Sequence, residues 1–252
     1  ERARRIAVVL TERPQVGALG VMDLVEMGRQ PYTGWAGTLT SEDRRISADA
    51  LAQVGGAHLA GRTVDSLSDG ERQRVMIARA LAQQPDLMLL DEITAFLDLP
   101  SRVTIIDTLR RIAGEQGVTI ILSSHDLELS LQTADRLWLL PGNGRFIDGT
   151  PEDVALSGAI GEAFDQENLA FSLASGRFET PARSGRAIHV EGEGVAAYWL
   201  VRALQRCGYA LSNDSADTDH RIVQLPGGWR LDEAAEAASI GQLLRTLSAS
   251  SV

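Results

Sequence analysis

Two adjacent acids and one histidine have the types and spacing best suited to chemistry on a charged ligand. Asp91 and Glu92 directly follow the apolar run Leu87–Leu90, which is typical of a buried strand in a parallel sheet. A carboxylate at the carboxyl end of such a strand lies at the crevice where open α/β sheets bind ligands. His125 follows a second apolar run, and an imidazole there can donate a hydrogen bond to a phosphate. Taken alone, the acid pair is compatible with a helix cap, and the histidine with a structural role.

A second constellation is the stretch Leu67–Gln73, which reads Leu-Ser-Asp-Gly-Glu-Arg-Gln. Ser68 precedes an expected helix, whose amino end offers free N–H groups and positive dipole charge to an anion. Gly70 lets the backbone approach a phosphate that any Cβ would crowd. The alternative interpretation is an ordinary N-cap followed by acids in the first turn.

In this order, the motifs resemble the ATPase subunit of ABC transporters over about residues 1–165. The resemblance implies that Asp91 helps to hold Mg²⁺ through water and that Glu92 polarises the water that attacks ATP. It also implies that His125 contacts the γ-phosphate as the switch histidine. Four signature residues would complete the nucleotide site of the opposite subunit, so that two chains sandwich two ATP molecules: Ser68, Gly70, Glu71 and Gln73.

Two further positions follow from the same resemblance. Asp98 matches the key acid of the D-loop, which crosses the dimer interface, although Ile93 stands where many members have Pro. The Q-loop normally ends its strand with a Gln that senses Mg²⁺ and the attacking water. Thr11 falls at that position and offers a hydroxyl to a metal-bound water, with Glu12 as a charged alternative.

The family's phosphate loop, G-x-x-x-x-G-K-[ST], does not occur in this sequence, which contains no lysine. The chain begins at Glu1, and Arg5–Leu10 reads as a strand already inside a domain. We therefore interpret the chain as the part of an ABC ATPase downstream of its phosphate loop, and expect it to be inactive by itself. A degenerate relative that never had the loop is the alternative.

Composition narrows the function classes. The net charge of −10 argues against a nucleic-acid partner, because phosphate neutralisation needs a basic surface. The single cysteine excludes a disulfide framework and fits a reducing compartment. No apolar run approaches the ~18 residues that span a bilayer, and no signal peptide is evident. We expect a cytoplasmic protein, peripheral on the inner face of the cell membrane.

The alternation of strands and helices predicts an α/β fold with right-handed crossovers. In family terms this is a P-loop NTPase-like ABC ATPase domain that lacks its Walker A part and includes a helical subdomain. The expected strands are Arg5–Leu10, Leu87–Leu90 (buried on both faces), Val118–Leu122 and the hairpin Arg136–Leu140 with Arg145–Ile147. The expected helices start at Val21, at Ser41 (an N-cap, running to about Val54), at Gly70, at Pro100 and at Asp126.

A composition shift over residues 174–185 predicts a domain boundary. We assign residues 1–170 to the partial ATPase domain and residues 185–252 to a small α/β accessory domain, for which we expect a regulatory role. Its expected β-α-β-α elements are Ala187–Val190, Gly194–Cys207, Ile222–Leu225 and Asp232–Leu247. One helix carries an apolar stripe that needs a partner surface: Val195, Tyr198, Leu200, Val201 and Leu204.

The segment Val25–Tyr32 resembles the region after the Q-loop in ATPases that import iron-siderophores, haem and cobalamin. That region faces the membrane subunits, although a helix C-cap followed by a turn also explains the residues. The expected function is ATP hydrolysis that powers import of an iron chelate or cobalamin. The expected partners are a second ATPase copy, transmembrane permease subunits and, indirectly, a periplasmic or lipoprotein substrate-binding protein. A non-transport ABC ATPase and a non-hydrolytic regulator are the alternatives.

Overall fold

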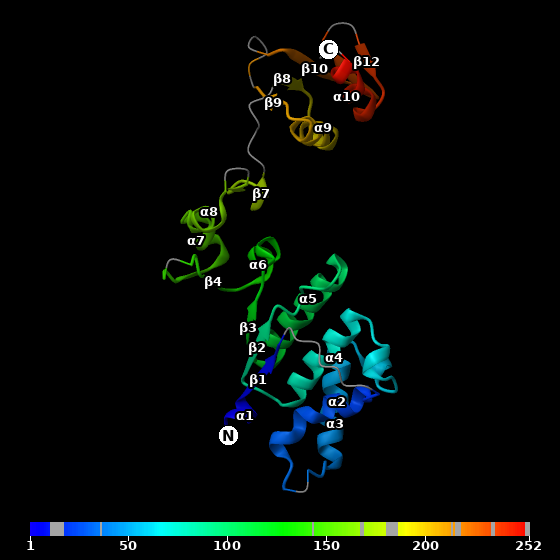
Figure 1. Cartoon of the computed structure of the whole chain (residues 1–252), viewed down its shortest axis with the longest axis vertical. Coiled ribbons are helices and arrows are strands. Elements are labelled where there is room, and N and C mark those ends of the chain that lie inside the picture. Colours follow the sequence, from blue (N-terminus) through cyan, green and yellow to red (C-terminus); the bar gives the residue numbers. More distant parts are fainter. Residues whose placement is uncertain are drawn as a thin grey trace. The chain divides into compact units, whose positions relative to one another are not determined.

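The computed structural model describes residues 1–10, 18–35, 37–142, 144–166, 169–179, 186–212, 214, 218–232 and 235–249. The chain divides into two compact units, Glu1–Ala159 and Ile160–Val252, and each has a hydrophobic core of its own (Figure 1). Within the described ranges, no helix is long and apolar enough to cross a membrane. The predicted division into residues 1–170 and 185–252 stays a prediction.

A parallel three-stranded sheet forms the centre of the first unit, in the order β1-β2-β3. The strands are β1 (Ile6–Val9), β2 (Leu87–Asp91) and β3 (Thr119–Ser123), close to the predicted ranges, with a short helix α1 (Arg2–Arg5) before them. The prediction that β2 is fully buried on both faces is wrong. Met88 and Leu90 are buried but Leu87 and Leu89 are only half-buried, because alternate side chains point to opposite faces and the described helices cover one of them.

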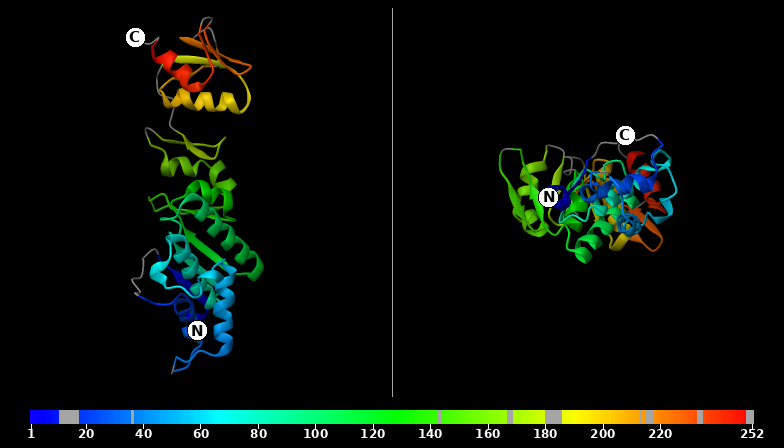
Figure 2. Two further views of the ribbon diagram at one scale, coloured as in Figure 1. Left: turned by 90° about the vertical axis from the view of Figure 1, so that its right-hand side faces the viewer. Right: turned by 90° about the horizontal axis from the view of Figure 1, so that it is seen from below.

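Three helices pack beside this sheet as a group: α2 (Val21–Glu26), α3 (Ser41–Gln53) and α4 (Asp69–Ala82) (Figures 1 and 2). The N-cap of α3 is Thr40 and not Ser41 as predicted. Its hydroxyl accepts a hydrogen bond from the Asp43 N–H, while the Asp43 carboxylate accepts from the Thr40 N–H, which completes a capping box. The apolar side chains of α4 are buried, and they supply much of the core between the helices and the sheet.

The segment after α2 is more regular than a helix C-cap followed by a turn, because Met27–Tyr32 forms a 3₁₀ helix, η1. A glycine is required at its second position, because a Cβ on Gly28 would lie 2.1 Å from the backbone oxygen of Arg79 in α4. Pro31 lies inside this short helix, one residue before its end at Tyr32. The short 3₁₀ turns η2 (Ala57–Leu59) and η3 (Val64–Ser66) then lead into α4.

The rest of the first unit follows the prediction except at the second hairpin strand, which is Ile147–Gly149 and not Arg145–Ile147. Helix α5 (Leu99–Gln116) ends at Gly117, whose φ of +68° is the left-handed conformation that commonly closes a helix. After β3 come α6 (Leu127–Thr133), the antiparallel pair β4 (Leu137–Leu139) and β5 (Ile147–Gly149), and α7 (Pro151–Leu156). Helix α8 (Ala159–Phe164) lies at the division between the units.

The second unit is richer in strands than predicted. After the hairpin β6 (Ala170–Ser172) and β7 (Arg177–Glu179), its described residues form a five-stranded sheet in the order β12-β11-β10-β8-β9. The strands are β8 (Ala187–Glu191), β9 (Ala210–Leu211), β10 (His220–Leu225), β11 (Gly228–Leu231) and β12 (Ala235–Ala237). The prediction of one helix over Asp232–Leu247 is wrong: β12 lies within that range, and α10 (Ile240–Ala249) begins only after it.

Helix α9 (Gly194–Arg206) does not carry the single apolar stripe that we expected. Leu200 and Leu204 are fully buried in a core shared with the sheet and α10, whereas Val195 and Tyr198 are exposed. The sheet of the same unit therefore provides the partner surface for the buried side of the helix.

Candidate active site

Strands β2 and β3 end at the same edge of the sheet and place Asp91 directly opposite Ser123. The hydroxyl of Ser123 donates a hydrogen bond to Asp91 Oδ1 at 2.7 Å. The two elements are parallel neighbours, so their carboxyl ends lie side by side, as expected for a ligand-binding edge.

Glu92 follows in an unusual backbone conformation. Its φ is +47°, in the left-handed region that costs a non-glycine residue on the order of 1–3 kcal/mol. The Glu92 N–H donates to both the backbone oxygen (3.2 Å) and the hydroxyl oxygen (3.0 Å) of Ser123. Because this turn ends the strand alternation, the side chain of Glu92 is not held to the face opposite Asp91.

His125, two residues beyond β3, meets the carboxylate of Glu92. Its Nε2 lies 2.5 Å from Glu92 Oε1, and the imidazole is 84% exposed while the Glu92 side chain is 33% exposed. The structure thus brings the three residues predicted to act on ATP and its Mg²⁺ to one edge of the sheet. An exposed carboxylate beside an imidazole can accept a proton from water and share it through a hydrogen bond.

The predicted signature residues start helix α4. The Ser68 hydroxyl accepts from the Glu71 N–H at 3.3 Å, and Glu71 Oε2 accepts from the Ser68 N–H at 2.8 Å, so the two form a capping box. The N–H and hydroxyl of Ser68, together with Arg62 at 2.9 Å, hold the pKa of Glu71 below its ordinary value. The Glu71 carboxylate is therefore an anion whose hydrogen bonds stabilise the start of α4.

Gly70 and Gln73 are not explained by the packing of this chain. A Cβ on Gly70 would meet Ser101 Oγ at 3.4 Å, an ordinary van der Waals contact, so the fold alone does not require glycine there. The Nε2 atom of Gln73 is buried, and within the described part of the chain it has no hydrogen-bond partner. Both positions are compatible with a requirement from outside the subunit.

The predicted D-loop acid has a clear local role. The carboxylate of Asp98 accepts from the Ser101 N–H at 3.2 Å and caps α5, and the hydroxyl and N–H of Ser101 lower the pKa of Asp98. Since Ser101 also lies nearest to Gly70, the starts of α4 and α5 are brought together. Thr11, the predicted Q-loop residue, lies outside the described residues, as does Glu12.

The edge suits Mg²⁺ bound mainly through water and phosphate. Over the described ranges, no group of three or more His, Cys, Asp or Glu side chains could enclose a metal ion. Mg²⁺ in nucleotide sites typically uses one or two carboxylates plus substrate oxygens and water, and the exposed Asp91 at the sheet edge fits that role. Ser123 was missed by sequence reasoning, although its place at the end of the strand next to the acids was a usable signal.

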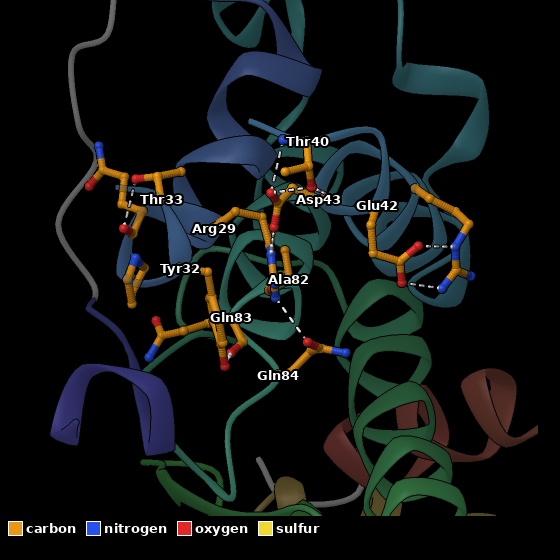
Figure 3. A network of polar contacts seen from close by, with 12 residues as sticks. Arg29, Tyr32, Thr33, Thr40, Glu42, Asp43, Ala82, Gln83 and Gln84 are labelled. Carbon is orange, nitrogen blue, oxygen red and sulfur yellow. Dashed lines mark hydrogen bonds and ion pairs between the residues drawn. The ribbon is translucent and has the colours of Figure 1, made fainter. Parts of the chain in front are cut away.

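The segment predicted to face membrane subunits turns its two largest motif residues inward (Figure 3). Arg29 is 4% exposed; its Nε donates to Asp43 Oδ1 at 2.9 Å, and its Nη1 donates to the Ala82 oxygen at 2.8 Å. Tyr32 covers the guanidinium at 3.8 Å and donates its hydroxyl hydrogen to the Gln83 oxygen at 2.9 Å. These two side chains join η1 to α3 and to the end of α4.

Comparison with family models gives two matches, one within each unit. Residues 2–95 match the ABC transporter model, and residues 185–248 match the model described as the iron ABC transporter C-terminal domain. The first match includes the signature, Asp91 and Glu92, and ends before Asp98 and His125.

Several curated proteins are similar to this chain. An uncharacterized ABC transporter ATP-binding protein of Methanocaldococcus jannaschii is 37% identical over 198 residues, which cover 77% of this chain and 68% of the relative. The cobalamin import ATP-binding protein BtuD of Halobacterium salinarum is 35% identical over 237 residues, or 89% of this chain and 59% of the relative. The petrobactin import ATP-binding protein FpuC of Bacillus anthracis is 38% identical over 165 residues, or 66% and 61%.

The chain therefore spans only 59% to 68% of the length of these relatives. Among solved structures, an ABC transporter described as of metal-chelate type, in an inward-facing conformation, matches with a TM-score of 0.60 and 29% identity. The match covers 70% of each chain, which extends the likeness from motifs to fold.

Proposed function

Because this chain belongs to the ATP-binding proteins of ABC transporters, we propose that its residues, completed by a phosphate loop, bind and hydrolyse ATP to power import of a metal chelate. The observation that carries the proposal is the edge where Asp91, Glu92 and His125 meet, with the acid pair held by Ser123. A half-buried carboxylate on a strained turn, beside an exposed imidazole, is typical of functional sites.

Asp91, Glu92 and His125 have different proposed roles, which follow from their positions at the sheet edge. Asp91, at the end of β2, orients the water molecules that surround Mg²⁺, and the metal supplies positive charge that offsets the phosphate oxygens. Glu92 accepts a hydrogen bond from the attacking water and so raises the water's nucleophilicity. His125 donates a hydrogen bond toward the γ-phosphate and fixes the Glu92 carboxylate at 2.5 Å. Thr11 is proposed at the Q-loop position.

The signature helix serves a second copy of the chain in this proposal. Ser68 and Gly70 present the amino end of α4, where backbone N–H groups attract phosphate. That the fold tolerates a Cβ at Gly70 supports an external reason for the glycine. Glu71 holds this helix end through the capping box, Gln73 lies one turn further on, and Asp98 begins the neighbouring α5. A homodimer around two ATP molecules follows.

The transported substrate is proposed to be an iron chelate, such as a siderophore or haem, or cobalamin. Support comes from the iron-transporter model over residues 185–248 and from relatives named for cobalamin and petrobactin import. The proposed partners are permease subunits in the membrane and, through them, a substrate-binding protein, and the proposed location is the cytoplasmic face of the cell membrane. We further propose that residues 185–252 form an accessory domain with a regulatory role and that residues 1–170 form the ATPase part.

The test compares two chains: the 252-residue chain, and one extended upstream through a phosphate loop. We expect the extended chain to bind ATP and release phosphate in a Mg²⁺-dependent way. The shorter chain should do neither at micromolar ATP, because the loop amides and lysine make most of the ground-state contacts. Calorimetry and phosphate release measure both. Micromolar ATP binding by the shorter chain, or an inert extended chain, would contradict the proposal.

A further inference from the structure

The hydroxyl of Ser123 joins the two acids of the sheet edge. A serine hydroxyl has one donor hydrogen and two acceptor lone pairs. In this structure it accepts from the Glu92 N–H at 3.0 Å and donates to Asp91 Oδ1 at 2.7 Å. Since the N–H can only donate and the carboxylate accepts, the direction of both bonds is fixed.

Those two bonds act on two different features of the site. The donated bond is charge-assisted, which is the stronger class of hydrogen bond, and it sets the rotation of the Asp91 carboxylate. The accepted bond supports the left-handed turn at Glu92, where φ is +47°. The backbone oxygen of Ser123 shares the same N–H at 3.2 Å, so removing the hydroxyl weakens the support of the turn without abolishing it.

The position of Ser123 argues against a role in the packing core. It is exposed, it ends β3, and it lies opposite Asp91 in the parallel register. Exposed hydrogen bonds add little to folding stability because water can replace them. Their value at this edge is geometric, since a water or a metal shell must meet both carboxylates in one orientation.

We propose that Ser123 is a positioning residue for ATP hydrolysis: it aligns the Asp91 carboxylate and the Glu92 turn for Mg²⁺ and the attacking water. The inference rests on the proposed function, because it assigns Ser123 to the same reaction. It predicts that the hydroxyl matters to turnover and to the use of Mg²⁺, and hardly to the binding of ATP.

The experiment compares Ser123→Thr with Ser123→Val in the chain extended through the phosphate loop. The two variants have the same shape and differ by a hydroxyl. We expect Thr to keep kcat within about threefold of the parent, and Val to lose about tenfold or more, the scale of one charge-assisted hydrogen bond. The KM for ATP should stay within about twofold in both, while the half-saturating Mg²⁺ concentration rises several-fold in Val alone.

Thr119→Val is the matched control, because it makes the same hydroxyl-to-methyl change at the other end of β3 and should leave kcat unchanged. Equal kcat and Mg²⁺ dependence for the Thr and Val variants would overturn the inference. So would a loss in Val that is fully accounted for by a lower folded fraction in thermal melting. If Glu92→Gln has the same kcat as the parent, the proposed function is contradicted. If Glu92→Gln is inactive while Ser123→Thr and Ser123→Val have equal kcat, only the role of Ser123 is contradicted.

Discussion

Two polar clusters in the first unit, Arg29 with Asp43 and Glu92 with His125, differ in the burial of their side chains and in the backbone that carries them. Arg29 and Asp43 are 5% and 10% exposed in their side chains, and their polar atoms contact partners on η1, α3 and the end of α4 (Figure 3). At the sheet edge the side chain of Glu92 is half-buried and that of His125 is exposed, and Glu92 lies on a strained turn. The first arrangement stabilises the fold, and the second leaves its groups available for a ligand.

Electrostatics separates the clusters in the same way. The Thr40 hydroxyl and N–H and the Arg29 guanidinium lower the pKa of Asp43 to about 2, so its charge is tied into the folded state. A largely exposed contact such as that between Glu92 and His125 contributes at most about 1 kcal/mol, and often nothing. The close approach of Glu92 and His125 therefore contributes little to folding stability and is better explained by a role in binding or catalysis.

The largest expected effect is on turnover at the exposed cluster. In the extended chain, Glu92→Gln keeps the shape of the side chain but removes the charge that polarises water. Loss of kcat should be on the order of 10²-fold or more, with ATP binding retained and the variant accumulating as an ATP-bound dimer. Phosphate release and size-exclusion chromatography with ATP measure this. The melting temperature of Glu92→Gln should equal that of the parent. Turnover of this variant within a few-fold of the parent would contradict the assignment of Glu92.

Arg29→Met should show the opposite pattern. Removing one partner leaves a buried carboxylate without its cation, which is strongly destabilising, and we expect the melting transition of this unit to fall by roughly 10 °C. Arg45→Met is the control. Its guanidinium pairs with Glu42 and Asp49 on the exposed side of α3 and is 62% exposed, so its loss should shift melting little. Equal shifts for the two variants would remove the distinction between buried and exposed clusters.

Gly28 and Gly70 test whether a glycine is required by packing within the fold or by function. Gly28→Ala places a Cβ 2.1 Å from the Arg79 oxygen and should destabilise the fold by about 1–3 kcal/mol. Gly70→Ala meets only ordinary contacts and should change stability by less than about 0.5 kcal/mol, yet it should impair ATP-dependent dimerisation. Urea unfolding and sedimentation with ATP distinguish them, and a destabilised Gly70→Ala would show that its glycine serves the fold.

The buried cluster also predicts a pH dependence. The folded-state pKa of Asp43 is about 2, against an ordinary value of 3.8, so its contribution is fully present above about pH 4 and is lost as the pH falls through about 2. The difference in unfolding midpoint between the parent and Asp43→Asn should shrink from pH 6 to pH 2.5. Asp49→Asn, on the exposed face of α3, is the control. A difference that stays constant over this range would contradict the role of the Asp43 charge.

The smallest effect is expected from removing the second predicted domain, which lies outside both clusters. Truncation of the extended protein after Ser184 should leave basal ATPase activity within a few-fold, while transport or its regulation changes. All predicted ATPase residues precede that point in the sequence. Loss of hydrolysis with the circular dichroism spectrum of the ATPase unit intact would show that the carboxy-terminal part belongs to the catalytic unit.

The sequence by itself determined those features that depend on near neighbours in the chain. The capping box of Ser68 with Glu71 and the N-cap at Asp98 are local hydrogen bonds between residues three apart, so the starts of α4 and α5 could be predicted. The apolar run before Asp91 likewise predicted β2. The motif pattern placed the catalytic candidates in the right family, although Thr11 lies where the structure gives no test.

Only the tertiary structure decided what distant segments do to one another. Arg29 and Tyr32 looked like partner-facing residues, but they pack against α3 and the end of α4, which lies more than fifty residues along the chain. The register between β2 and β3 places Ser123 opposite Asp91. The short strands β11 and β12 are stabilised by hydrogen bonds to their neighbouring strands. Pairing and burial across such separations depend on the folded neighbours rather than on local propensity, so the composition of a segment alone cannot determine them.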